Sequence, residues 1–129
     1  MTISVDWQAD RGETACSVQF EDMQWFADFD KKTGGAGKHP SPHELLDSAL
    51  GACTALTIEL YAKRKGYPLS GVQVEVDREE SAGVYRLQRR IHLQGELDGA
   101  IREDLLRVAN KCPIHKALSG QFVIDSELV

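Results

Sequence analysis

The chain has 129 residues, and its 15 Lys and Arg residues against 20 Asp and Glu residues give a formal net charge of −5. This acidic balance excludes the basic footprint that nucleic acids and anionic membranes require, so neither is expected as a partner. A chain of this length can bury a core without disulfides or metals, and we expect one domain over residues 1–129.

The N-terminal sequence MTISVDWQAD has neither the basic start nor the apolar run of a secretory signal. No later segment is expected to stay apolar long enough to cross a bilayer. We therefore expect a cytoplasmic protein whose three cysteines remain thiols. Cysteines of this kind are buried, bind metal or react, which makes them the main candidates for function.

The first third of the chain alternates short apolar stretches with turn residues. The stretches cover residues 3–7, 15–20 and 25–29, and their aromatic and β-branched content predicts a small antiparallel meander. The segment KKTGGAGKHPSP that follows has three glycines and two prolines. It is predicted to be a loop.

A long helix is predicted to begin at Pro42, with Ser41 as its N-cap and Glu44 placed to reach back in a capping box. Cations in the sequence KRK precede Gly66, where the helix is expected to end. Its apolar face is wider than a small monomer needs. Residues at helical spacing form this face: Leu46, Ala49, Leu50, Cys53, Leu56 and Leu60.

A β-hairpin is predicted after the long helix, with Val72, Val74 and Val76 in its first strand. In the second strand Arg89 interrupts an apolar face. It could pair with an acid or serve a site, but we expect an edge position from which the long side chain reaches water. The apolar residues of that face are Tyr85, Leu87, Ile91 and Leu93.

A second helix is predicted after Gly99, interrupted by Pro113 and followed by a short helical piece over residues 114–118 and a last strand around Phe122 and Ile124. Strands therefore cluster around one long and one shorter helix, without regular alternation. The expected class is α+β, with helices covering one face of mainly antiparallel sheets. The apolar stripe of the second helix is Ile101, Leu105, Val108 and Cys112.

Two of the three cysteines have informative surroundings. Cys53 lies among small residues in the middle of the long helix, where it is either an inert buried residue or a thiol that needs a cation or donor from elsewhere. If a helical turn starts at Pro113, Cys112 sits at a helix N-terminus, where free backbone donors favour a thiolate. Cys16, in a strand without such neighbours, is expected to be structural.

Two segments of the sequence resemble motifs of the OsmC/Ohr family. The segment SPHELLDSALGACT, which ends just after Cys53, resembles that family's first cysteine helix. The segment NKCPIHKAL, which contains Cys112, resembles its second cysteine motif, a Cys-Pro pair before the last strand. The order of the predicted elements is also that of the family, so the resemblance covers nearly the whole chain.

The resemblance implies an OsmC-like fold, an intertwined homodimer and a thiol-dependent peroxidase that reduces organic, and also inorganic, hydroperoxides in oxidative-stress defence. Cys53 would attack the peroxide, and Cys112 would resolve the resulting sulfenic acid as a disulfide. An external dithiol or thiol would then reduce the disulfide. No cofactor and no metal are expected.

The sequence departs from the family pattern at the residues that activate the first cysteine. Better understood members have a Glu ten residues before it, where this chain has His43. The neighbouring Glu44 is rotated by about 100° on a helix, and its capping role is the competing explanation. In the N-terminal region, from which the family's Arg comes, this chain offers only Arg11, and the sequence Asp10-Arg11-Gly12 around it is explained more simply by a turn. His43, Glu44 and Arg11 are retained as supporting site candidates.

Two other functions remain open. One is an OsmC-like stress or ligand-binding protein with weak or no peroxidase activity, because a fold alone does not fix a function. The other is a zinc site that combines Cys112 and His115 with His39 or His43, since thiolate and imidazole ligands suit zinc.

Overall fold

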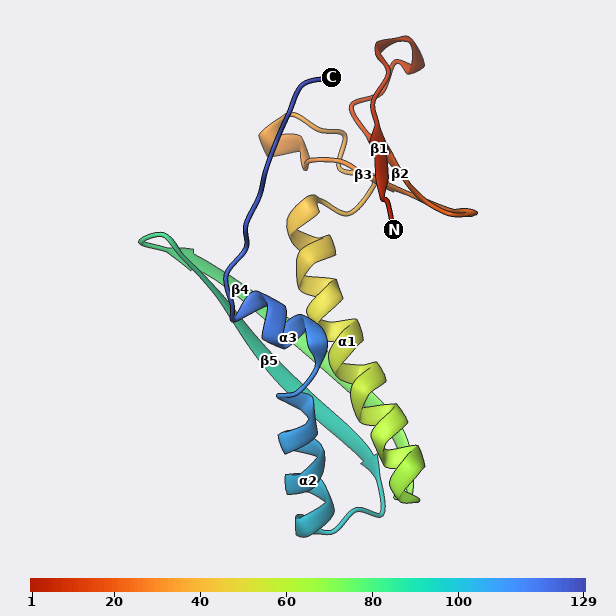
Figure 1. Cartoon of the computed structure of the whole chain (residues 1–129), viewed down its shortest axis with the longest axis vertical. Coiled ribbons are helices and arrows are strands. Elements are labelled where there is room, and N and C mark those ends of the chain that lie inside the picture. The colour runs from red at the N-terminus through yellow and green to blue at the C-terminus, as the bar shows by residue number, and fades with distance from the viewer. The chain divides into compact units, whose positions relative to one another are not determined.

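The computed structural model describes all residues 1–129, which form two compact units, residues 1–46 and residues 47–129. Figure 1 identifies the elements along the chain. Each unit combines strands with helical segments, and the expected α+β class with antiparallel sheets and one long helix is confirmed. The single-domain organisation stays a prediction.

The first unit contains the predicted antiparallel meander. Its strands are β1 (Ser4–Asp6), β2 (Cys16–Phe20) and β3 (Met23–Ala27), in the order β1-β2-β3. Short 3-10 helices lie at Ala9–Arg11 and Lys31–Thr33. The buried Asp28 side chain accepts hydrogen bonds from Phe29 N at 2.8 Å and Ala36 N at 2.9 Å, and thereby fixes the loop predicted after the meander.

Helix α1 (Pro42–Lys65) begins and ends where the sequence predicts. The Ser41 hydroxyl hydrogen-bonds to the Glu44 carboxylate, and Gly66 adopts a left-handed φ of 70° that stops the helix. By length and composition alone α1 could cross a membrane, contrary to our expectation. In the second unit this apolar character serves the core, because Ile58 and Ala62 are almost fully buried there.

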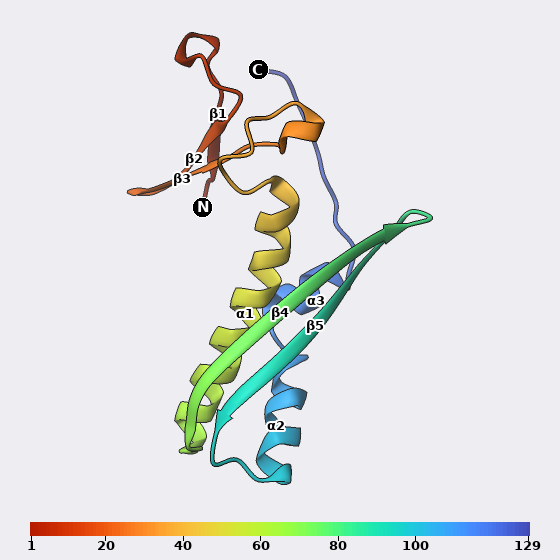
Figure 2. The same cartoon turned by 180° about the vertical axis from the view of Figure 1, so that it is seen from behind.

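The second unit is a two-stranded sheet with helices on one face. The predicted hairpin is formed by β4 (Leu69–Ser81) and β5 (Val84–Gly95), and α2 (Gly99–Ala109) and α3 (Pro113–Leu118) follow it. Figure 2 shows the hairpin in front of α1, α2 and α3. The core lies between these layers, where Ile58 and Ala62 of α1 pack with Leu105 and Ala109 of α2.

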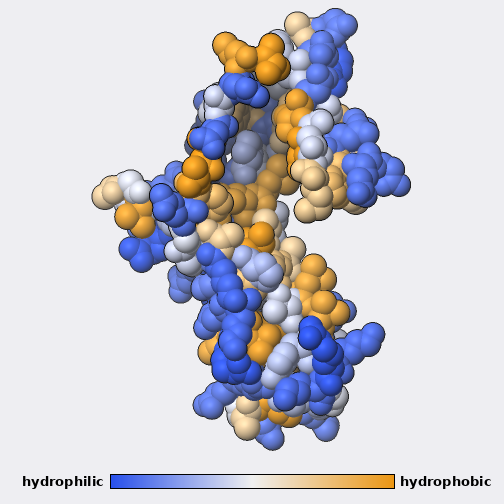
Figure 3. Space-filling view, in the orientation of Figure 1, coloured by the Kyte–Doolittle hydropathy of each residue, from blue (hydrophilic) through white to orange (hydrophobic).

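Part of the apolar face of α1 is left at the surface. Leu56 and Leu60 are 55% and 51% exposed and lie one helical turn apart. Figure 3 shows apolar side chains, in orange, on the part of the surface that α1 occupies. The wide apolar face predicted from the sequence is therefore only partly used within this chain.

Two sequence predictions about the C-terminal part are wrong. Residues 121–129 form no strand, and Phe122 and Ile124 are 60% and 83% exposed. β-propensity alone forms no strand without a neighbouring strand to accept its backbone hydrogen bonds. The second helix ends at Ala109, so Cys112 is buried but lies outside its apolar stripe.

Candidate functional site

Cys112 is fully buried and caps the N-terminus of α3. Its backbone is extended, Pro113 occupies the first helical turn, and its Sγ atom accepts a hydrogen bond from the backbone N–H of His115 at 3.2 Å. The chain thus starts a new helical turn at Pro113, directly after this cysteine. This places Cys112 at a helix N-terminus, the position considered from the sequence. The sulfur atom receives one of the backbone donors that a helix N-terminus leaves free.

Thr54 connects Cys112 to the helix that carries Cys53. This fully buried threonine donates its hydroxyl hydrogen to the carbonyl of Leu50 at 2.7 Å, and its Oγ1 atom lies 4.0 Å from Cys112 Sγ. Thr54 directly follows Cys53 in the sequence. The structure therefore places the second cysteine against the same turn of α1 that holds the first.

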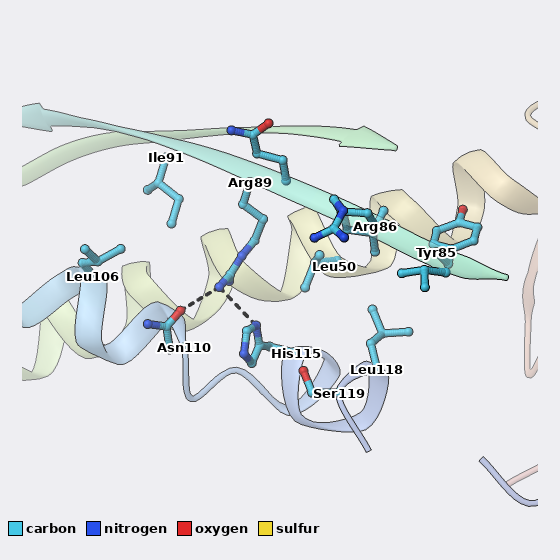
Figure 4. A pocket seen from close by; sticks show the side chains of 13 residues that line it. Leu50, Tyr85, Arg86, Arg89, Ile91, Leu106, Asn110, His115, Leu118 and Ser119 are labelled. Carbon is cyan, nitrogen blue, oxygen red and sulfur yellow. Dashed lines mark hydrogen bonds between the residues drawn. The ribbon is translucent and has the colours of Figure 1, made fainter. Parts of the chain in front are cut away.

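The side chain of Arg89 does not reach out to water from the edge of the sheet, and that sequence prediction is wrong, because the guanidinium points to the helices. Arg89 lies opposite Val76 of β4, and both residues are on the face of the hairpin that meets the helices. The guanidinium reaches Thr54 and the surroundings of Cys112, as Figure 4 shows for Asn110 and His115. The interruption of the apolar alternation was thus the sequence signal of this polar cluster, which the preference for an edge position obscured.

The guanidinium of Arg89 donates to neutral groups. Nη1 lies 2.9 Å from Thr54 Oγ1 and 3.1 Å from the carbonyl oxygen of Ala109. Nη2 lies 2.8 Å from Asn110 Oδ1 and 3.1 Å from His115 Nδ1. A partly buried cation whose four acceptors carry no negative charge leaves a positive potential beside Cys112.

Cys53 has a simpler environment. Its side chain is half-buried, and its Sγ atom lies 4.0 Å from the hydroxyl oxygen of Thr57, one turn further along α1. At that distance either atom can be the donor in a weak hydrogen bond. The first cysteine is therefore the more accessible thiol, and the second is the more firmly held.

A cavity of about 570 Å³ adjoins the Arg89 cluster (Figure 4). Leu50, Ile91, Leu106 and Leu118 give it apolar walls. Its polar lining includes Arg86, Arg89, Asn110, His115 and Ser119, with no carboxylate. Such a mixture of apolar surface and hydrogen-bond donors suits a small ligand with an acceptor-rich group.

The supporting candidates from the sequence lie in the first unit. Arg11 forms an ion pair with Asp6 at 2.8 Å, and Glu44 is hydrogen-bonded to Ser41 at the start of α1, as its capping role predicts. His43 is exposed in the first turn of the same helix. Cys16 is half-buried in β2 opposite Ala27.

The zinc alternative gains no support in the second unit. Cys112 and His115 meet no third Cys, His, Asp or Glu there that could complete a metal site. His115 also has its Nδ1 atom against Arg89 Nη2. A cation at this position disfavours a second cation.

A second polar cluster in the same unit is centred on the carboxylate of Asp104. Tyr67 donates to it at 2.7 Å, Tyr61 at 2.9 Å and Arg107 at 2.6 Å. The hydrogen bond from Tyr67, followed by that from Arg107, lowers the pKa of Asp104 to about 2. The same bond and the burial of the ring raise the pKa of Tyr67 to about 12.

Solved structures share this fold over nearly the whole chain. An osmotic stress induced and detoxification response protein from Psychrobacter arcticus matches 91% of this chain and 87% of its own, with 24% identity and a TM-score of 0.77. An OsmC-like protein from Mycoplasma pneumoniae matches 92% and 86%, with 23% identity and a TM-score of 0.74. Identities at this level establish the fold alone.

An organic hydroperoxide resistance protein from Legionella pneumophila is also similar, with 20% identity, a TM-score of 0.65 and coverage of 92% of this chain and 88% of its own. No curated protein matches the sequence. The sequence model of the family described as OsmC-like protein matches residues 35–127, which include both Cys53 and Cys112. The chain therefore belongs to the OsmC-like protein family.

Proposed function

We propose that this protein is a thiol-dependent peroxidase that reduces organic, and also inorganic, hydroperoxides through Cys53 and Cys112. The observation that carries the proposal is the contact of Cys112 with Thr54, because it brings the second thiol to the turn of α1 that holds the first. Similar structures named organic hydroperoxide resistance proteins support the substrate class.

The reaction has three balanced steps. The Cys53 thiolate attacks one peroxide oxygen, the O–O bond breaks, and with one proton from solvent the products are a Cys53 sulfenic acid and the alcohol, or water from an inorganic peroxide. The Cys112 thiol then attacks the Cys53 sulfur, forming a disulfide and releasing the oxygen as water. An external dithiol or thiol reduces the disulfide and is itself oxidised.

The exposure of the two cysteines fits these roles. A peroxide has to reach the attacking thiol, and Cys53 is the half-buried one. A resolving thiol needs contact only with Cys53, so the full burial of Cys112 is compatible with its task. Arg11, Glu44 and His43 remain secondary candidates for assisting Cys53.

A homodimer in the cytoplasm completes the proposal. Leu56 and Leu60 expose an apolar stripe of α1 that a second copy of the chain would cover. The partners would then be the second copy, the hydroperoxide and the external reductant, without nucleic acid or membrane.

A second candidate is an OsmC-like ligand-binding or stress protein with weak or no peroxidase activity. The cavity of about 570 Å³ favours it, because a space of this size beside hydrogen-bond donors suits a small ligand. The two functions differ in whether a bound hydroperoxide is consumed.

Consumption of cumene hydroperoxide in the presence of excess dithiothreitol tests the proposal. Cys53→Ser should abolish turnover. Cys112→Ser, treated with the peroxide in the absence of dithiothreitol, should stop at a Cys53 sulfenic acid that a dimedone adduct reveals by mass spectrometry. Cys16→Ser is the matched control and should retain the wild-type rate. Equal, small effects of all three substitutions would contradict the peroxidase and favour the ligand-binding protein.

A further inference from the structure

Arg89 uses every hydrogen of its two terminal nitrogens. Nη1 and Nη2 carry two hydrogens each, and each nitrogen has two acceptors in the structure. The acceptors belong to α1, to the end of α2 and to α3. From strand β5, Arg89 thus joins the three helical segments that meet around Cys112.

The hydrogen bonds of Thr54 fix the direction of the Cys112 thiol. The only hydroxyl hydrogen of Thr54 is donated to the carbonyl of Leu50, and Oγ1 accepts from Arg89. In the contact between Thr54 Oγ1 and Cys112 Sγ the thiol must then be the donor. The S–H bond of Cys112 therefore points towards α1, the helix that carries Cys53.

The side chain of His115 is fixed in a similar way. A guanidinium can only donate, so His115 Nδ1 accepts from Arg89 Nη2 and the ring hydrogen is on Nε2. The backbone N–H of the same residue donates to Cys112 Sγ. Arg89 therefore holds both residues that contact the sulfur of Cys112. His115 donates its backbone N–H to the sulfur, and Thr54 orients the thiol hydrogen.

The geometry points to Arg89 as a positioning residue that holds the Cys112 thiol ready for attack on Cys53. This inference rests on the proposed function and deepens it, because it assigns a residue to the second step of the reaction. Arg89 contacts neither the peroxide nor Cys53 in this account. It acts through Thr54 and His115.

The second step explains why a cation is useful at this place. As Cys112 Sγ bonds to Cys53 Sγ, the Cys112 S–H bond and the Cys53 S–O bond break, and the proton leaves with the oxygen as water. Negative charge develops on Cys112 Sγ while its proton departs. The guanidinium of Arg89 stabilises this charge, because no carboxylate neutralises it. Its hydrogen bonds to Thr54 and His115 hold the Cys112 sulfur in position.

Two oxidants separate this inference from the proposed function. Cumene hydroperoxide requires the complete peroxidase reaction, whereas diamide oxidises two thiols to a disulfide and is reduced to a hydrazine without any peroxide. Formation of the Cys53 to Cys112 disulfide would be followed by acid quenching and peptide mass spectrometry. The variants are Arg89→Met, Arg89→Lys and Thr54→Val, with Arg90→Met as the matched control on the opposite face of β5.

Arg89→Met should slow disulfide formation about tenfold or more with both oxidants, because charge-assisted hydrogen bonds are lost. With peroxide, Cys53 oxidation should stay within about twofold of wild type and the sulfenic acid should accumulate, since only the second step is affected. Arg89→Lys should recover part of the rate because it retains the charge. Thr54→Val should be slow as well, and Arg90→Met should behave as wild type.

Three results would overturn the inference. One is an unchanged disulfide rate in Arg89→Met. Another is an equal slowing of Cys53 oxidation and of disulfide formation without rescue by Arg89→Lys, which would indicate a purely structural role. The third is the absence of the disulfide with both oxidants in the wild-type protein.

The two oxidants also distinguish failure of this inference from failure of the proposed function. If peroxide forms no disulfide but diamide does, and Arg89→Met slows the reaction with diamide, the peroxidase proposal fails and the positioning role of Arg89 stands. If Arg89→Met does not fold, Arg89→Lys and Thr54→Val decide the question.

Discussion

Two polar clusters of the second unit differ in the charge at their centre. Around Asp104, a carboxylate receives hydrogen bonds from two tyrosines and is paired with Arg107. Around Arg89, a guanidinium donates to a hydroxyl, a carbonyl, an amide and an imidazole, none of which is an acid. The first cluster is electrically balanced, and the second keeps a positive charge next to a cysteine.

This difference separates a stabilising cluster from a candidate site. If Arg89 only linked helices, a carboxylate would be a better acceptor than these neutral groups, because it would form stronger hydrogen bonds with the guanidinium. Neutral acceptors leave its charge available to a group whose charge changes, and Cys112 is such a group. The Asp104 cluster, with no cysteine beside it, joins α1 to α2 and the chain after α1.

The largest effect on stability is expected from Thr54→Val. The substitution removes the acceptor of Arg89 and leaves a buried N–H group without a partner, which should lower the free energy of unfolding by about 1–3 kcal/mol. Thr57→Val, three residues further along the same helix, removes only the 4.0 Å contact with Cys53 Sγ and should cost less than about 0.5 kcal/mol. Urea denaturation measures both, and equal losses would contradict the difference between the two cysteine environments.

The Asp104 cluster should be the one that responds to acid. The pKa of Asp104 is lowered to about 2 from an ordinary value near 3.8, so its contribution to stability is present above pH 4 and is lost as the pH falls towards 2. In Asp104→Asn this part of the pH dependence should disappear. Thermal unfolding between pH 2 and pH 5 would show it, and an unaltered slope in the variant would refute the assignment.

A smaller effect of opposite sign is expected in alkali. The pKa of Tyr67 is raised from its ordinary value of 10.0 to about 12, so its contribution is complete below pH 10 and is lost as the pH rises through 12. Tyr67→Phe should already lack this contribution at neutral pH and should lose less stability in alkali. Unfolding monitored by circular dichroism between pH 9 and pH 12 compares the two proteins, and an equal loss of stability in both would contradict the assignment to Tyr67.

Local signals predicted much of the fold. Ser41 and Pro42 set the start of α1, Gly66 its end, and the alternating valines the hairpin, because caps, turns and periodicity act within a few residues. The absence of the expected last strand around Phe122 and Ile124 could not be foreseen in the same way, since strand formation depends on a neighbouring strand that the local sequence does not specify.

The candidate site was predicted in part. The two cysteines and the helix start after Cys112 followed from motifs and from Pro113. The role of Arg89 did not follow, because the break in alternation that it causes has several explanations and only the tertiary contacts with Thr54 and His115 distinguish them. Thr54 looked like one more small residue beside Cys53, and its burial against Cys112 emerges only from the tertiary contact between α1 and the residue that caps α3.

The most direct test of the account is a disulfide map of the wild-type protein after one equivalent of cumene hydroperoxide. Tryptic peptides analysed without reduction should show Cys53 linked to Cys112, with Cys16 alkylated as a free thiol. Peroxide consumption without this link, or a disulfide that contains Cys16 in its place, would contradict the assignment of Cys53 and Cys112 as the reacting pair.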